Sequence, residues 1–203
     1  MACEPLRDGE IAALITYLEM REAPATPVPP SPLSLRPMTP PGLDEYRRLF
    51  RLVGAPWLWF SRLTRDDAAL AAIIRHPDVE IFAVIDANGS EVGILELDFR
   101  APGECELAFI GLVPELAGRG HGRWLLAAAL DLAWRKDVRR VHVHTCSLDH
   151  PAALSAYRRA GFTAFQRAIE RFADPRLAGI LPADCAPQVP LVGTLTAAPS
   201  PPS

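Results

Sequence analysis

The chain has 203 residues, of which 49% are hydrophobic and 22% charged, as expected of one globular domain with a hydrophobic core. Its formal net charge of −3 argues against nucleic acid as a partner, because proteins that bind nucleic acid usually carry a basic excess. No stretch is long and apolar enough to span a bilayer, and the N-terminus lacks the charged start and apolar run of a secretory signal, so we expect a cytoplasmic protein with no membrane partner.

The first third of the chain predicts two short strands and two helices. Residues 10–20 are apolar, and we interpret them as a strand because of the run Ile-Thr-Tyr, although the alanines and glutamates also suit a helix. A proline-dense linker follows at 24–41, and within it residues 33–36 alternate apolar and polar side chains as a short strand does. Helical spacing predicts a helix over 42–53 and a second from its N-cap Thr64 to about residue 75.

The remainder predicts strands with two inserted helices. Asn88-Gly89 is a strong hairpin signal between two apolar runs, and Gly161 suits a helix C-terminus. In chain order we expect strands at 79–87, 91–99 and 105–113, a helix at 120–136, a strand at 138–146, a helix at 151–160 and a strand at 162–172. This order predicts an α/β fold with a mixed, mostly antiparallel central sheet flanked by helices. The tail from residue 174 should pack on the body to about Gly193, and the last ten residues should be disordered.

No metal site or disulfide framework is expected. The cysteines are scattered, with no CxxC pair, at Cys3, Cys105, Cys146 and Cys185. His142 and His144 share one face of a predicted strand, but no acidic or cysteine ligand at suitable spacing accompanies them.

The most informative segment is the glycine-rich turn between the strand at 105–113 and the following helix. Gly118, Gly120 and Gly122 fall at alternate positions, where glycine lets the backbone approach a ligand and the helix start supplies unpaired N–H groups. Arg119 and Arg123 add positive charge, so we predict an anion site suited to a pyrophosphate. No lysine follows the glycines as in a nucleotide P-loop, and no βαβ unit surrounds them as in a dinucleotide fold.

This turn resembles the coenzyme A signature of the GNAT superfamily of N-acetyltransferases, Arg/Gln-x-x-Gly-x-Gly/Ala after a strand ending in Val-Pro-Glu. Gly120 and Gly122 match the signature, whereas Ala117 replaces its Arg/Gln. A second segment, residues 149–162, is similar to the family's Asn-x-x-Ala-x-x-x-Tyr-x-x-x-Gly-Phe. There Ala153, Tyr157, Gly161 and Phe162 match, and His150 takes the place of the asparagine.

The resemblance implies a GNAT domain at 33–172, preceded by an apolar segment and linker at 1–32 and followed by a tail at 173–203. It implies an acyl-CoA-dependent N-acyltransferase that moves acetyl from acetyl-CoA to a primary amine by direct attack in a ternary complex, with no metal. The expected coenzyme A-binding residues are Leu112, Val113, Gly118, Arg119, Gly120, His121, Gly122, Arg123, His150 and Tyr157.

For catalysis, the resemblance makes Tyr157 the general acid that protonates the leaving thiolate. Glu106 falls where histone-type members carry a catalytic base, but its neighbours Glu104 and Glu96 have similar claims. Strand alternation puts Glu104 on the same face as Glu106, and ordered water is an equal alternative. A backbone N–H near Leu112 or Val113, where we expect the strand to bulge, would stabilise the oxyanion.

The acceptor pocket is expected between the first two helices, where Trp57, Trp59 and Phe60 either line it or plug the core, with Glu96 nearby. The acceptor itself stays open among small-molecule and peptide amines, and a homodimer is possible. Two alternatives keep the fold: a non-catalytic sensor that binds coenzyme A, and an acyltransferase that uses a longer acyl-CoA.

Overall fold

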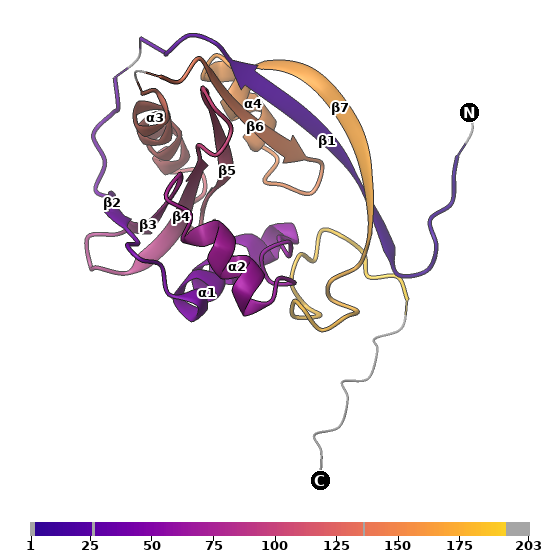
Figure 1. Cartoon of the computed structure of the whole chain (residues 1–203). Coiled ribbons are helices and arrows are strands. Elements are labelled where there is room, and N and C mark those ends of the chain that lie inside the picture. The colour runs from indigo at the N-terminus through magenta and orange to yellow at the C-terminus, as the bar shows by residue number, and fades with distance from the viewer. Residues whose placement is uncertain (1–2, 26, 136, 194–203) are drawn as a thin grey trace.

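The computed structural model describes residues 3–25, 27–135 and 137–193, which form a seven-stranded sheet with helices on both faces (Figure 1). The strand order is β2-β3-β4-β5-β6-β1-β7, and every neighbouring pair is antiparallel except β5 with β6. The strands are β1 (Glu10–Met20), β2 (Ser34–Pro37), β3 (Val79–Ile85), β4 (Glu91–Asp98), β5 (Glu104–Leu112), β6 (Arg140–Cys146) and β7 (Thr163–Ala173). The helices are α1 (Leu43–Gly54), α2 (Asp67–Ile74), α3 (His121–Ala133) and α4 (Ala153–Arg159), with short 3-10 turns η1 (Ala55–Trp57) and η2 (Pro114–Leu116). The predicted mixed α/β fold is confirmed.

Each face of the sheet has its own apolar core. Helix α1 buries Tyr46, Leu49 and Phe50 against β3 and β4, together with residues of α2. On the other face, α3 and α4 pack on the central strands through a larger cluster that includes Leu125 and Tyr157. The helical spacing seen in the sequence therefore marks the sides of the helices that contact the sheet.

Helix α2 begins two residues later than predicted. Its N-cap is Asp66, whose carboxylate accepts a hydrogen bond from the Ala69 N–H at 2.7 Å. The prediction that Thr64 caps this helix is wrong, because the Thr64 hydroxyl donates to the Ser61 carbonyl in the preceding turn. Asp66 and Thr64 are both good caps by residue type, and only the backbone path decides between them.

The N-terminal segment supplies an internal strand of the same sheet. β1 lies between β6 and β7 and is antiparallel to both, so that Met20 pairs with Val141 and Glu10 with Ala173 (Figure 1). Leu18 and Met20 are buried in the core under α3 and α4. The segment 1–32, which we expected to lie outside the domain, thus contributes an internal strand of the sheet through β1.

Two irregularities in β5 shape the centre of the molecule. β5 pairs with β6 only over Glu104–Glu106, and then the two strands separate while β6 continues along β1. A bulge at Ala108 falls between Leu107, which pairs with Leu97, and Phe109, which pairs with Glu96. The extra residue re-aims the strand, so that Phe109 faces the α1 and α2 side while Leu107 faces α3.

The C-terminal tail folds back against β1 and the segment after η1. Arg176 is almost completely buried, where it pairs with Asp174 at 2.7 Å and donates to the carbonyl oxygens of Cys185, Ala186 and Val189. Leu181 of the tail packs near Leu58 and Ile11. The last ten residues, expected to be disordered, lie outside the described residues. Among the described helices, none has the length and apolar character needed to cross a membrane.

Candidate functional site

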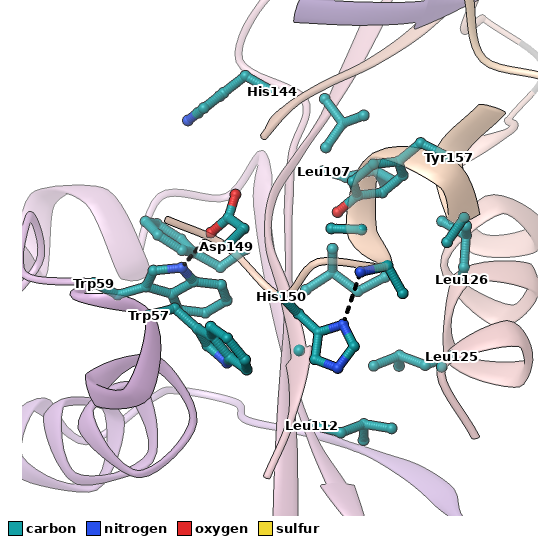
Figure 2. Close-up of a pocket in the computed structure, with 18 of the residues that line it drawn as sticks. Trp57, Trp59, Leu107, Leu112, Leu125, Leu126, His144, Asp149, His150 and Tyr157 are labelled. Carbon is teal, nitrogen blue, oxygen red and sulfur yellow. Dashed lines mark hydrogen bonds between the residues drawn. The ribbon is translucent and has the colours of Figure 1, made fainter. Parts of the chain in front are cut away.

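A cavity of about 1130 Å³ opens where β5 and β6 separate. Its lining comes from both faces of the sheet: from α3 and α4 on one side, and from the segment after η1 on the other (Figure 2). Leu107, Leu125 and Tyr157 line it on the α3 side, and Trp59 and Phe109 on the α1 side. The gap between β5 and β6 thus connects the two faces of the sheet, so that ligands bound from opposite faces could contact each other there.

The glycine-rich turn forms one end of the cavity. Gly118 and Gly120 have φ values of +75° and +81°, a left-handed conformation that side chains rarely adopt, and Gly120 is the N-cap of α3. A Cβ atom added at Gly118, Gly120 or Gly122 would meet nothing within 4 Å, so the space beside the helix start is open. Arg123 also lines the cavity, whereas Arg119 and His121 are not part of the lining. The turn offers backbone N–H groups and one arginine to an anion.

The backbone of β5 forms the next part of the wall. Leu112 and Val113 line the cavity, but the Val113 N–H donates to the Val92 carbonyl at 2.9 Å and is not free. The expectation of a bulge near Leu112 or Val113 is wrong, because the bulge lies at Ala108. Beyond Glu106, the edge of β5 that faces β6 has no strand partner among the described residues, which is the arrangement that an extended ligand can use for main-chain hydrogen bonds.

Tyr157 points its hydroxyl into the cavity from α4 (Figure 2). Its ring is buried and meets Phe162 edge-on, with the ring centroids 5.8 Å apart. The hydroxyl has no hydrogen-bond partner within the described part of the chain. Burial raises the pKa of Tyr157 above that of a free tyrosine, so the phenol keeps its proton at neutral pH.

Asp149 organises the wall beside Tyr157, and sequence reasoning missed it. One carboxylate oxygen accepts from Trp59 Nε1 at 3.1 Å, and the other accepts from Thr145 Oγ1 at 2.7 Å and the Cys146 N–H at 2.8 Å. This carboxylate ties the end of β6 to the segment after η1, across the cavity (Figure 2). The signal in the sequence was an aspartate just after a strand, a residue that often bonds to nearby backbone.

The predicted aromatic residues lie together on the lining. Trp57 meets the ring of His150 edge-on at 5.2 Å, and His150 Nδ1 accepts from the Ala152 N–H at 3.1 Å. Phe60 packs on Phe172, with ring centroids 5.0 Å apart, next to the buried tail residues.

Trp59 fills space that two glycines leave. A Cβ at Gly54 would come within 2.5 Å of Trp59 Cβ, and one at Gly111 within 3.2 Å of its ring. Trp59 therefore packs in the core and lines the cavity at once, so the two roles considered for it coexist.

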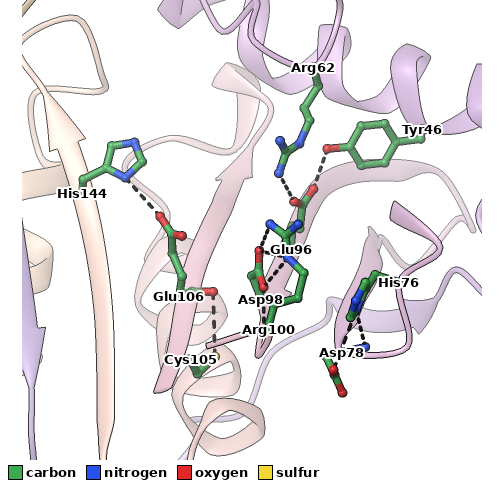
Figure 3. Close-up of polar contacts among 10 residues, drawn as sticks. All are labelled: Tyr46, Arg62, His76, Asp78, Glu96, Asp98, Arg100, Cys105, Glu106 and His144. Carbon is green, nitrogen blue, oxygen red and sulfur yellow. Dashed lines mark hydrogen bonds and ion pairs between the residues drawn. The ribbon is translucent and has the colours of Figure 1, made fainter. Parts of the chain in front are cut away.

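The structure distinguishes the two candidate glutamates on β5. Glu106 lines the cavity, and its carboxylate lies 3.3 Å from His144 Nδ1 (Figure 3). The hydrogen bond with His144 lowers the pKa of Glu106, although burial opposes this, and the same bond raises the pKa of His144. Glu104 pairs with Arg140 at 2.8 Å and lies 3.6 Å from His142, and it is not part of the lining.

Glu96 lies beneath the cavity wall instead of on it. Its side chain is fully buried, and it accepts from the Tyr46 hydroxyl and from Arg62 Nη2, each at 2.5 Å (Figure 3). Arg62 does line the cavity, as do Asp98 and Arg100, which pair with each other at 2.5 Å. Sequence reasoning missed these three residues, since arginines and an aspartate in this region carry no motif.

Comparisons with known proteins show the family to which the chain belongs. A family model described as "Acetyltransferase (GNAT) family" matches residues 44–162, more than half of the chain. A curated relative, the mycothiol acetyltransferase of Clavibacter michiganensis subsp. michiganensis (strain NCPPB 382), is 31% identical over 136 residues, which cover 66% of this chain and 43% of the relative. The chain thus spans less than half the length of that relative.

Two solved structures show the same fold. One is a GCN5-related N-acetyltransferase from Sphaerobacter thermophilus, at 21% identity and a TM-score of 0.56, covering 82% of this chain and 52% of that chain. The other is an aminoglycoside acetyltransferase from an uncultured soil metagenomic sample, at 18% identity and a TM-score of 0.54, covering 68% of this chain and 93% of that chain. On the strength of the family match, the chain belongs to the GNAT acetyltransferase family.

Proposed function

We propose that this protein transfers the acetyl group of acetyl-CoA to a primary amine held in the same cavity. The observation that carries the proposal is the cavity at the gap between β5 and β6, with the glycine-rich turn at one end and the Tyr157 hydroxyl in its wall. Because the chain belongs to the GNAT acetyltransferase family, we interpret this arrangement as a site for acetyl transfer.

The residues present suit coenzyme A. Its phosphates would lie against the N–H groups at the start of α3, with Arg123 beside them and no need for the arginine or glutamine that Ala117 replaces. Its pantetheine arm would follow the unpaired edge of β5. Val113 lies seven positions after Glu106, which is about 23 Å of extended chain, enough for the arm to end partway and leave room for an acceptor.

The reaction needs a nucleophile, an acid and an acceptor for a proton. The amine nitrogen forms a bond to the thioester carbonyl carbon, and the C–S bond breaks to release the thiolate. Tyr157, whose hydroxyl faces the cavity and keeps its proton at neutral pH, donates that proton to the sulfur. The proton lost by the amine passes to Glu106, directly or through water.

Calorimetric titration with acetyl-CoA, coenzyme A and NADP tests the cofactor. We expect binding of the first two and none of NADP, and a protein that binds neither coenzyme A species contradicts the proposal. Gly120→Val should weaken coenzyme A binding at least tenfold. Gly89→Val is the matched control, since Gly89 has a φ of +82° and equally open surroundings but lies in the β3–β4 hairpin, so it should lose stability without losing coenzyme A affinity.

Two observations support alternatives within the same fold. Ala117 and the absence of Arg119 from the lining suit a sensor that binds coenzyme A without turning it over. The cavity, at about 1130 Å³, is also large enough for a longer acyl chain. Thiol release measured with acetyl-CoA and with longer acyl-CoAs, over a panel of amines, separates the three functions.

A further inference from the structure

We propose that the acceptor amine also carries a carboxylate, and that Arg62 and Arg100 bind this group. The inference rests on the proposed function and names the class of its acceptor: a free amino acid with an apolar side chain. It arises from two arginines at one end of the cavity, to which the transfer chemistry gives no role.

This end of the cavity lies away from the glycine-rich turn. Arg62, Asp98, Arg100 and Glu106 line it, together with His144. Asp98 pairs across the sheet with Glu106, at the opposite end of β5 from Val113. A group bound here would lie beyond the reacting carbon as seen from the phosphates, where the acceptor must enter.

Arg62 has more hydrogen-bond donors than partners. Its side chain is only 13% exposed, and Nη2 donates to Glu96 at 2.5 Å. Nε is buried without a partner, and Nη1 has no partner among the described residues. The guanidinium carbon also lies 5.1 Å from the centre of the Phe109 ring, a cation–π contact. With Nη2 bound to Glu96 and Nε buried, Nη1 is the donor of Arg62 that remains for a ligand carboxylate in the cavity.

Arg100, just after β4, is also paired with a carboxylate but is more exposed than Arg62, at 42% of its side chain. Its Nε and Nη2 both contact the Asp98 carboxylate, and Nη1 has no partner in the described part of the chain. Glu96 and Asp98 are buried, and their ion pairs hold the two arginines before a ligand arrives, which reduces the side-chain entropy lost on binding.

The three acidic side chains nearest the two arginines are already paired. Glu96 and Asp98 pair with Arg62 and Arg100, and Glu106 pairs with His144, which is cationic when protonated. Glu170 of β7, another acidic residue of the lining, lies near enough to His144 to help raise its pKa. A ligand carboxylate bound to the arginines would therefore not lie beside an unpaired Glu96, Asp98 or Glu106. The adjacent Trp59, Phe60 and Phe109 offer the apolar surface for a side chain.

Product analogues test the subsite without turnover. With coenzyme A present, calorimetry compares N-acetyl-glycine, N-acetyl-leucine and N-acetyl-phenylalanine with their carboxamides. We expect at least one acid to bind about 10- to 100-fold more tightly than its amide, the range for a hydrogen bond to a charged group.

Charge-balanced variants locate the effect. Arg62→Gln alone would strand the buried Glu96 carboxylate and destabilise the fold, so the test uses Arg62→Gln with Glu96→Gln, and separately Arg100→Gln with Asp98→Asn. Each pair should reduce the preference for the acid at least fivefold. Arg47→Gln is the matched control, because Arg47 pairs with Asp67 outside the cavity lining, and it should leave the preference unchanged.

Equal binding of acids and amides by the wild-type protein overturns the proposal, and so does a preference that survives in both charge-balanced variants. Failure to bind coenzyme A refutes the proposed function instead. In that case the same analogues, titrated without coenzyme A, still decide whether the arginines select a carboxylate.

Discussion

Removing the Tyr157 hydroxyl, a change of one oxygen atom, should affect catalysis without affecting stability. Tyr157→Phe removes a buried hydroxyl that has no described hydrogen-bond partner and leaves the ring contact with Phe162 in place. The free energy of unfolding should therefore change by less than about 1 kcal/mol. Loss of a general acid should lower kcat by about 10²- to 10⁴-fold, while the Kd for coenzyme A stays within about twofold.

The other two tyrosines provide matched controls for the loss of a phenol hydroxyl. Tyr46→Phe removes the bond to the buried Glu96 carboxylate, so it should cost about 1.5–3 kcal/mol of stability. Tyr17→Phe keeps the ring beside His144, at 5.9 Å between ring centroids, and should change neither stability nor kcat appreciably. Thiol release gives kcat, urea unfolding gives stability, and calorimetry gives the Kd.

Two results would refute this reasoning. If Tyr157→Phe keeps the wild-type kcat, Tyr157 is not the acid. If it unfolds as readily as Tyr46→Phe, its hydroxyl has a structural partner and any loss of activity is indirect. The raised pKa adds a third check, because kcat should show no loss from ionisation of Tyr157 below about pH 10.

Two further predictions concern the residues around the cavity. The raised pKa of His144 means that its pairing with Glu106 stabilises the fold fully below the unfolded histidine pKa of about 6.5, and that this contribution is lost as pH rises through the folded value. Urea unfolding at pH 6 and pH 8.5 should show a smaller loss of stability over this interval for His144→Gln than for the wild type; an equal loss means that the pair contributes nothing. Gly111→Ala places a Cβ at 2.8 Å from Val53 and 3.2 Å from Trp59, so it should cost about 1–3 kcal/mol by overpacking, and an unchanged unfolding midpoint would show that Trp59 moves freely.

Most elements of the fold follow from local sequence signals. The hairpin at Asn88-Gly89, the apolar face of α1 and the glycine turn before α3 each depend on residues a few positions apart, and each was predicted correctly. The position of β1 between β6 and β7 was not predicted. It depends on pairings between residues far apart in the sequence, such as Met20 with Val141, which no short sequence motif indicates. The N-cap of α2 was misplaced because Thr64 and Asp66 are equivalent by residue type.

The candidate site was predictable where motifs exist and not where partners meet across the sheet. The glycine turn and Tyr157 belong to recognisable segments. Strand alternation could not separate Glu104 from Glu106, since the difference lies in their partners on β6: Arg140 for the former and His144 for the latter. The bulge was placed near Leu112 instead of Ala108, because a bulge is a mismatch between two strands and one strand alone does not reveal it.

The threading of β1 through the far half of the sheet has a consequence for synthesis. A chain that emerges from its N-terminus produces β1 first, yet Glu10 and Met20 must wait for Ala173 and Val141. The core of α1, α2, β3 and β4 can assemble from early, nearby segments, whereas the half that contains β6 and β7 closes only when nearly the whole chain is available. Until then the 11-residue strand β1 has no partner, and an unpaired apolar strand is prone to aggregation. The walls of the cavity are therefore completed last.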